Sequence, residues 1–162
     1  MKAIDSLSTD IIQQLGASQK GLVTAESCTG GLIIGALTDV SGASAVIDRS
    51  FITYSNNAKH ELLAVKNESL ATYGAVSDIV AGEMAAGALT ACPSAHYSIA
   101  VTGIAGPGGG TDKKPVGLVY IAIGALQRGV TISEHHFDGD RHAIRLQTVE
   151  AALKALLTQI ED

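Results

Sequence analysis

Aromatic residues are scarce in this sequence: two Phe, four Tyr and no Trp amount to 4% of 162 residues. The core must therefore be built from closely packed Ala, Val, Ile and Leu side chains. Proline is also rare, at three residues, whereas glycine occurs 18 times, which indicates close backbone approaches rather than extended linkers. No run approaches the ~20 apolar residues that a membrane-spanning helix needs, so we expect no membrane partner.

Cysteine and positive charge are limited as well. Cys28 and Cys92 are too few for a disulfide framework, and two free thiols suit a reducing cytoplasm. Residues 1–5 contain Asp5 where a secretory signal needs an apolar run, so we expect a cytoplasmic protein. The net charge of −5 argues against non-specific binding of nucleic acid, although it leaves room for a local anion site.

The composition and the hydrophobic pattern indicate one globular domain over residues 1–162. Apolar residues make up 46% and charged residues 17%. Helical periodicity and strand-like runs alternate along the chain, which predicts an α/β fold: a three-layer sandwich with a mixed sheet and helices on both faces. We expect a first helix over 4–15 that ends at Gly16, and a second helix that is capped by Thr29 and runs to 37. Further helices are expected over 56–64, 67–73 and 78–91 and from 140 onward. The expected strands are 21–26, 46–54, 97–102, 116–125 and 130–137.

Three segments of the sequence are candidates for catalysis or ligand binding, and residues 25–31 form the first of them. A strand ends near Glu26, and two glycines, Gly30 and Gly31, open the following helix. The unpaired amides of a helix start bind anions or an oxyanion, so this segment is a candidate binding site. A tight strand-to-helix turn capped by Thr29 explains the same residues without a ligand, and the sequence does not separate the two readings.

The second segment, residues 51–59, contains Lys59. If Ser55 or Asn56 caps the next helix, Lys59 lies in its first turn, where the helix dipole disfavours a cation. That field and desolvation would lower the pKa of Lys59, and such a lysine can act as a general base for a hydroxyl nucleophile. A solvated surface lysine is the alternative.

The third segment joins the glycine-rich loop 103–111 to the start of the last helix. The loop follows a buried strand but contains neither common nucleotide-binding fingerprint. Arg141 and Arg145 are four residues apart and share a helix face near its N-terminus, which favours a phosphate there. Pairing of one arginine with Asp138 or Asp140 is the alternative.

Histidines do not form a metal site in this sequence. His60 and Glu61 begin a metal-binding pattern, but Ala64 stands where the second ligand belongs. His135 and His136 point to opposite faces of a strand. We expect no metal and no cofactor.

Six strings in fixed order resemble the CinA C-terminal domain family, which includes stand-alone nicotinamide-nucleotide amidohydrolases of bacterial pyridine-nucleotide recycling. The strings cover nearly the whole chain: 25–31 (AESCTGG), 53–56 (TYSN) with Lys59, 74–77 (GAVS), 101–109 (VTGIAGPGG), 114–117 (KPVG) and 139–141 (GDR). The resemblance implies hydrolysis of the carboxamide of nicotinamide mononucleotide to nicotinic acid mononucleotide and ammonia. It also implies a small-molecule nucleotide substrate and a homo-oligomer, with a dimer favoured.

The resemblance assigns roles to residues of the three segments. Ser27 would be the nucleophile, Lys59 its base, and Tyr54 a second hydroxyl that relays a proton or orients Lys59. The residues that would line the pocket or hold an oxyanion or phosphate are Thr29, Gly30, Gly31, Thr102, Gly103, Gly106, Arg141 and Arg145.

Two alternatives stay open at this point. Cys28 is a rival nucleophile, because a thiol at a helix start is activated, although its side chain should point away from Ser27 into the core. A non-catalytic nucleotide-phosphate binding or sensor module would use the glycines and Arg141 but would not need Ser27, Tyr54 and Lys59 together. The small residues of helix 78–91 suggest a surface for a second copy of the chain.

Overall fold

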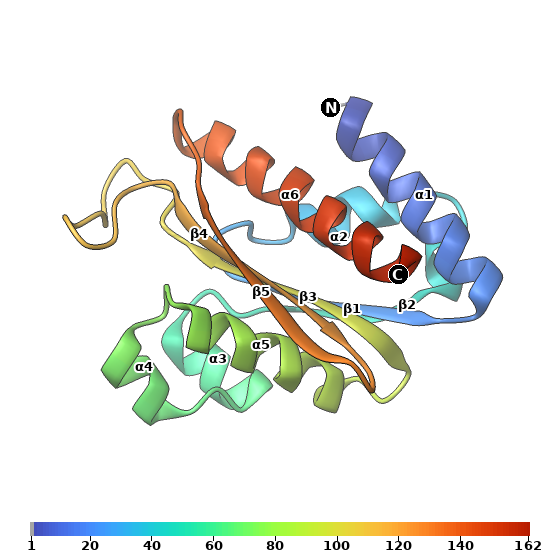
Figure 1. Ribbon diagram of the computed structural model, residues 1–162, viewed down its shortest axis with the longest axis horizontal. Coiled ribbons are helices and arrows are strands. Elements are labelled where there is room, and N and C mark those ends of the chain that lie inside the picture. The colour runs from blue at the N-terminus through green and yellow to red at the C-terminus, as the bar shows by residue number, and fades with distance from the viewer. Residues whose placement is uncertain (1) are drawn as a thin grey trace.

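A five-stranded sheet runs through the centre of the protein, and helices cover both of its faces (Figure 1). The computed structural model describes residues 2–162. Its elements, in chain order, are α1 (Lys2–Ser18), β1 (Gly21–Glu26), α2 (Leu32–Thr38), the 3-10 turn η1 (Ala43–Ala45), β2 (Ile47–Ile52), α3 (Asn56–Leu63), α4 (Asn67–Tyr73), α5 (Asp78–Ala91), β3 (Ala95–Gly103), β4 (Leu118–Ala125), β5 (Gly129–His136) and α6 (Arg141–Glu161). The predicted α/β fold with a mixed sheet is confirmed.

The order of the strands explains where polar residues meet. The order is β2-β1-β3-β4-β5, with β1 parallel to both β2 and β3, and with β4 antiparallel to its two neighbours. At the carboxyl end of β1, Glu26 lies opposite Ile52 of β2 and Val101 of β3. The residues that follow these three strands therefore meet at one edge of the sheet.

The helices form two layers with separate cores. Figure 1 shows α1, α2 and α6 on one face of the sheet and α3, α4 and α5 on the other. On the second face the small residues of α5 allow close packing: a Cβ on Gly87 would lie 1.9 Å from the carbonyl oxygen of Leu63, and one on Gly82 would lie 3.0 Å from the Ile132 side chain. These residues therefore serve contacts within the chain, and the surface for a second copy that the sequence suggested on α5 is largely covered.

Most predicted elements match the structure closely, but the end of the first helix differs, and α2 begins at Leu32 and not at Thr29. The predicted helices 56–64, 67–73 and 78–91 agree with α3, α4 and α5 to within a residue. Gly16, however, does not end the first helix, which continues to Ser18. The helix ends where Gln19 adopts a φ of 55° and the amide of Lys20 donates to the carbonyl of Leu15 at 2.9 Å.

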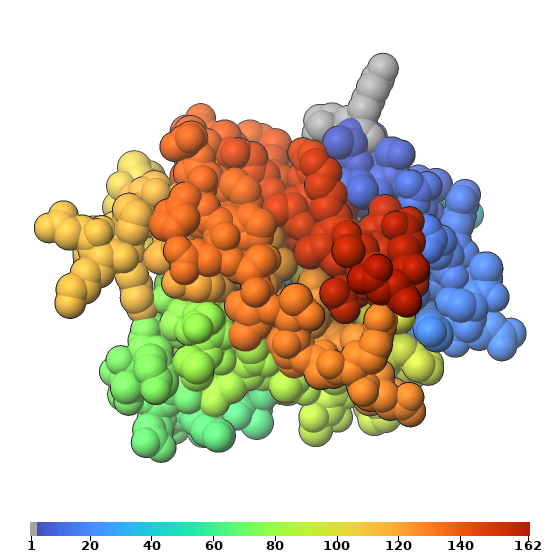
Figure 2. Space-filling view, viewed as in Figure 1, coloured from blue at the N-terminus to red at the C-terminus, as the bar shows by residue number. Residues whose placement is uncertain are grey.

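The glycine-rich segment between β3 and β4 projects from the body of the molecule, at the left of Figure 2. Its residues 107–113 are exposed. Across residues 2–162, none of the helices combines the length and the apolar character needed to cross a membrane.

Candidate active site

The contact between Ser27 and Lys59 is the centre of the candidate site. Ser27 follows β1 and is buried, and Lys59, the fourth residue of α3, is only 1% exposed. The Lys59 Nζ lies 2.9 Å from the Ser27 Oγ and donates to the carbonyl oxygen of Thr53 at 2.7 Å and to that of Tyr54 at 3.5 Å. A hydroxyl and a buried amine thus face each other, with two carbonyls holding the amine in place.

The helix α3 begins as the sequence predicts. Ser55 is the N-cap, and its Oγ accepts a hydrogen bond from the amide of Ala58 at 3.0 Å. Burial lowers the pKa of Lys59 from 10.5 to about 8, because the apolar surroundings disfavour the ammonium form. The lysine is therefore the buried amine that the functional hypothesis requires, and not a solvated surface residue.

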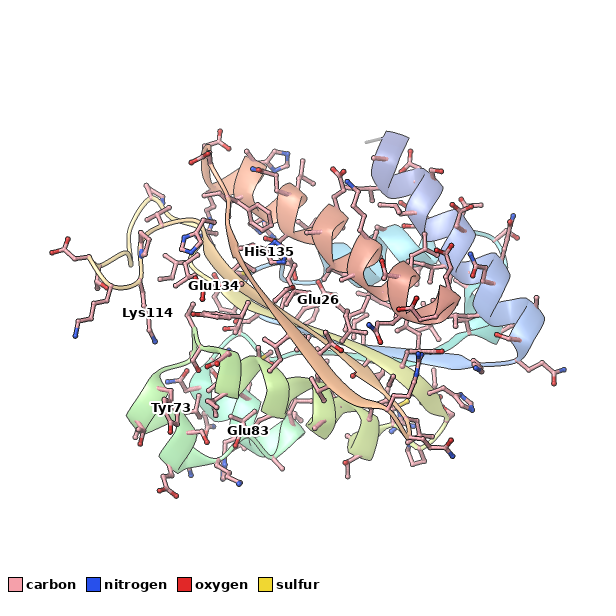
Figure 3. The ribbon with its side chains drawn as sticks, viewed as in Figure 1. Glu26, Tyr73, Glu83, Lys114, Glu134 and His135 are labelled. Atoms are coloured by element: carbon pink, nitrogen blue, oxygen red, sulfur yellow. The ribbon has the colours of Figure 1, made fainter. Side chains whose placement is uncertain are left out.

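The turn between β1 and α2 is organised by the carboxylate of Glu26, which is completely buried (Figure 3). Its Oε1 accepts hydrogen bonds from the Thr29 hydroxyl at 2.7 Å, the Gly31 amide at 3.1 Å and the Ile33 amide at 3.0 Å. Its Oε2 accepts from the Ile34 amide at 3.0 Å. The carboxylate of this side chain therefore occupies the positive end of α2.

This arrangement corrects two predictions. Thr29 does not cap α2, because its hydroxyl donates to Glu26 and the helix begins only after Gly31, whose φ is 103°. The amides of Gly30 and Gly31 are not free for a substrate oxyanion, because Gly30 donates to the Ser27 carbonyl at 3.0 Å and Gly31 donates to Glu26. Sequence reasoning missed Glu26, although a carboxylate beside a helix start was a signal for this pairing.

The two arginines of α6 are both bound to protein groups. Arg145 donates from Nε to the Cys28 carbonyl and from Nη2 to the Thr29 carbonyl, both at 3.0 Å. Arg141 donates from Nη1 to the carbonyl of Gly106 at 2.8 Å and from Nη2 to the Tyr54 hydroxyl at 2.9 Å. Neither arginine pairs with Asp138 or Asp140, and Asp140 instead caps α6 by accepting from the amide of Ala143.

Two cavities meet at Arg141 and Ala105. The smaller, of about 190 Å³, contains the Ser27–Lys59 pair, and the larger, of about 440 Å³, lies over the start of α6. The smaller cavity is lined by Ser27, Cys28, Tyr54, Lys59, Ala75, Val76, Thr102, Gly103, Ala105 and Arg141, and the larger by Ala105, Pro107, Val116, Gly139, Asp140, Arg141, His142 and Arg145. The structure thus brings the three segments of the sequence to two adjacent cavities, and it adds Ala75 and Val76, which sequence reasoning did not assign.

Three further predicted site residues have contacts that define what they can do. The Tyr54 hydroxyl binds Arg141, so this residue approaches Lys59 through its carbonyl and not through its hydroxyl. The Thr102 hydroxyl donates to the Ala75 carbonyl at 2.8 Å. Cys28 lines the same cavity as Ser27 instead of lying wholly in the core, but burial raises the pKa of its thiol to about 11. A thiol with that pKa is a poor nucleophile at neutral pH.

No group of three or more His, Cys, Asp or Glu residues within 2–162 is arranged to hold a metal ion.

The comparisons with known proteins agree over the whole chain. The sequence pattern of the CinA C-terminal domain matches residues 4–160. The chain is 46% identical over 158 residues to a protein of Enterobacter agglomerans named nicotinamide-nucleotide amidohydrolase PncC, covering 98% of this chain and 96% of that protein. A protein of the same name from Escherichia coli K12 is 47% identical over 154 residues, covering 94% and 92%. The crystal structure of the competence/damage inducible protein CihA from Agrobacterium tumefaciens superposes with a TM-score of 0.93 at 48% identity, covering 99% of this chain and 96% of that one.

Proposed function

Since this chain belongs to the CinA C-terminal domain family, we propose that it is an amidohydrolase that converts nicotinamide mononucleotide to nicotinic acid mononucleotide and ammonia. The relatives named nicotinamide-nucleotide amidohydrolase support the activity and the class of substrate. The observation that carries the mechanism is the contact of 2.9 Å between the Ser27 hydroxyl and the buried amine of Lys59. An amide is a weak electrophile, so a serine that attacks it needs a base at this distance.

Lys59 is suited to be that base in its neutral form. A neutral amine has two hydrogens and one lone pair. The carbonyls of Thr53 and Tyr54 accept the two hydrogens, which leaves the lone pair for the hydroxyl of Ser27. The lowered pKa provides a useful fraction of the neutral form near pH 7.

The proposed reaction proceeds through an acyl-enzyme. The Ser27 oxygen attacks the carboxamide carbon while its proton moves to Lys59. Lys59 then gives that proton to the amide nitrogen, the C–N bond breaks, and ammonia leaves. A water molecule attacks the ester and gives a proton to Lys59, and that proton returns to the Ser27 oxygen when the acid is released.

We assign the two ends of the substrate to the two adjacent cavities, which share Ala105 and Arg141. The carboxamide and its ring belong in the smaller cavity, where Ser27 lies. The ribose and the phosphate belong in the larger cavity, over the start of α6, where Arg141 and Arg145 supply positive charge. In this reading the Tyr54 hydroxyl orients Arg141, and its carbonyl orients Lys59.

Ammonia release from the purified protein and nicotinamide mononucleotide tests the proposal. Wild type is expected to release one ammonia per nicotinic acid mononucleotide, and Ser27→Ala is expected to abolish turnover while the substrate still binds. Ser6→Ala, the same change on the exposed face of α1, is the matched control and should behave as wild type. Binding without ammonia release from wild type would favour the alternative, a nucleotide-phosphate binding or sensor module.

Three earlier expectations stay predictions within this proposal. The homo-oligomer, with a dimer favoured, is testable by sedimentation of the full chain. The cytoplasmic location is testable by fractionation of cells that express the protein. The assignment of residues 1–162 to one domain is testable by limited proteolysis, which should yield no stable smaller fragment.

A further inference from the structure

Glu26 is a fully buried glutamate that the proposed reaction does not use. Besides the Thr29 hydroxyl and the three amides at the start of α2 described above, one of them from the N-cap Gly31, its carboxylate accepts a hydrogen bond from the Thr24 hydroxyl at 3.3 Å. None of the ion pairs among residues 2–162 includes it. Its charge is therefore balanced by backbone amides, hydroxyls and the dipole of α2, and not by a cation.

The same residue connects both halves of the Ser27–Lys59 pair. Its side chain holds the turn that begins at Ser27, through Thr29 and Gly31. Its main-chain carbonyl accepts from the amide of Thr53 at 2.8 Å, and the carbonyl of Thr53 in turn accepts from the Lys59 Nζ. The distance between Ser27 and Lys59 is therefore set by two segments that both bind to Glu26.

We propose that Glu26 is a positioning residue, whose buried carboxylate holds the turn after β1 so that the Ser27 hydroxyl stays within reach of the Lys59 amine. The inference rests on the proposed function for the role of Ser27 as the nucleophile. Glu26 is not the base itself, because its carboxylate oxygens bind the donors of the turn and of α2, whereas Lys59 is the group that contacts Ser27. The Glu26 carboxylate also excludes a substrate anion from the start of α2, because it occupies the amides there.

The geometry predicts that glutamine cannot replace this glutamate. The carboxylate accepts on both oxygens, but a glutamine has one carbonyl oxygen and one amino group. The amino group would face either the Ile34 amide or the cluster formed by the amides of Gly31 and Ile33, which are also donors. Glu26→Gln would therefore leave at least one donor unpaired and shift the turn.

The first test is the steady-state kinetics of Glu26→Gln with nicotinamide mononucleotide. We expect kcat to fall by about 10- to 100-fold while KM stays within about threefold, since Arg141 is held by Gly106 and Tyr54 and not by the turn. Glu83→Gln is the matched control, because Glu83 also accepts from a backbone amide and a hydroxyl, those of Lys66 and Ser69, but on α5. It should keep the kinetics of wild type.

The second test needs no amidase activity. In a Ser27→Cys, Cys28→Ala background, the introduced thiol should react rapidly with iodoacetamide at pH 7, because the Lys59 ammonium stabilises the thiolate. Adding Glu26→Gln should slow this alkylation by about tenfold, since the thiol moves away from the amine. Cys92, which is fully buried, serves as the unreactive internal reference.

The outcomes separate the two proposals. If wild type does not hydrolyse the nucleotide, the proposed function fails, and the alkylation rate alone decides the role of Glu26. If Glu26→Gln does not fold by circular dichroism, Thr29→Val removes one donor to the same carboxylate and should reduce both readouts by a smaller factor. A folded Glu26→Gln variant with the kcat and the alkylation rate of its parent overturns the inference. If Glu26→Gln does not fold, a Thr29→Val variant with an unchanged kcat and alkylation rate overturns it.

Discussion

Replacing Lys59 by arginine tests the proposed base most directly. Arginine keeps the positive charge, but its guanidinium does not release a proton at any pH at which the enzyme is stable. If Lys59 serves only as a positive charge near Ser27, the variant should retain activity. If it is the base, the variant should lose the contribution of general base catalysis, which is about 10²- to 10⁴-fold in kcat/KM.

The lowered pKa sets the size and the direction of the pH dependence. With a pKa of about 8, about a tenth of Lys59 is the free amine at pH 7, whereas a lysine of pKa 10.5 would have about one part in 3,000. Because the neutral form is the active one, kcat/KM should rise about tenfold from pH 6 to pH 7 and become nearly constant above about pH 9.

The same shift has a consequence for stability, with the opposite sign from that of a lysine whose pKa is raised by a salt bridge. The folded protein has a lysine pKa of about 8 and the unfolded chain one of 10.5, so between these values the unfolded state binds more protons. The contribution of Lys59 to the free energy of unfolding therefore rises with pH from about 8 to about 10.5 and is least favourable below that window. A comparison of wild type with Lys59→Met over this range isolates the contribution.

The assay is ammonia release at low substrate concentration between pH 6 and pH 9.5. Lys154→Arg, on the exposed surface of α6, is the matched control and should give the profile of wild type. A Lys59→Arg variant that retains more than about a tenth of kcat/KM, or that still shows a rise centred near pH 8, would refute the assignment of the base.

Three other predictions follow from the contacts in the structure. Arg141→Ala should raise KM for nicotinamide mononucleotide by about tenfold or more, because the phosphate loses a charge-assisted contact. The KM for the dephosphorylated riboside should change little. An equal rise in KM for both substrates would mean that Arg141 has a structural role. Cys28→Ala should keep at least about a third of the wild-type activity, whereas Ser27→Ala should abolish it, because a thiol with a pKa of about 11 is protonated at neutral pH. If the initial rates rank the two variants the other way, Cys28 is the nucleophile. In thermal unfolding, Gly87→Ala should destabilise the protein by about 2 kcal/mol or more, because the added Cβ would lie 1.9 Å from a backbone oxygen. The control, Gly35→Ala, adds a Cβ in open space within α2 and should be neutral or stabilise the protein by up to about 1 kcal/mol. Similar melting temperatures for the two variants would contradict this prediction.

Local patterns in the sequence were sufficient for the architecture. The apolar run over 97–102 predicted a buried strand, and the observed strand, β3, lies at the centre of the sheet. The convergence of Ser27, Lys59 and the glycine-rich loop was also predictable in outline, because each follows a strand end and the carboxyl ends of parallel strands share one edge. Residue type and spacing carry this information without knowledge of distant contacts.

The partners of the polar groups at that edge were decided only by the tertiary structure. The sequence shows free amides at the start of α2 and two arginines on α6, and either could bind a ligand. In the folded chain the Glu26 carboxylate accepts hydrogen bonds from the amides of Gly31 and Ile33, and Arg145 donates to the carbonyl of Thr29, 116 residues away in the sequence. The burial that lowers the pKa of Lys59 likewise arises from long-range packing. A hydrogen bond or a desolvated amine depends on which distant groups the fold brings within about 3 Å, and no local pattern encodes that distance.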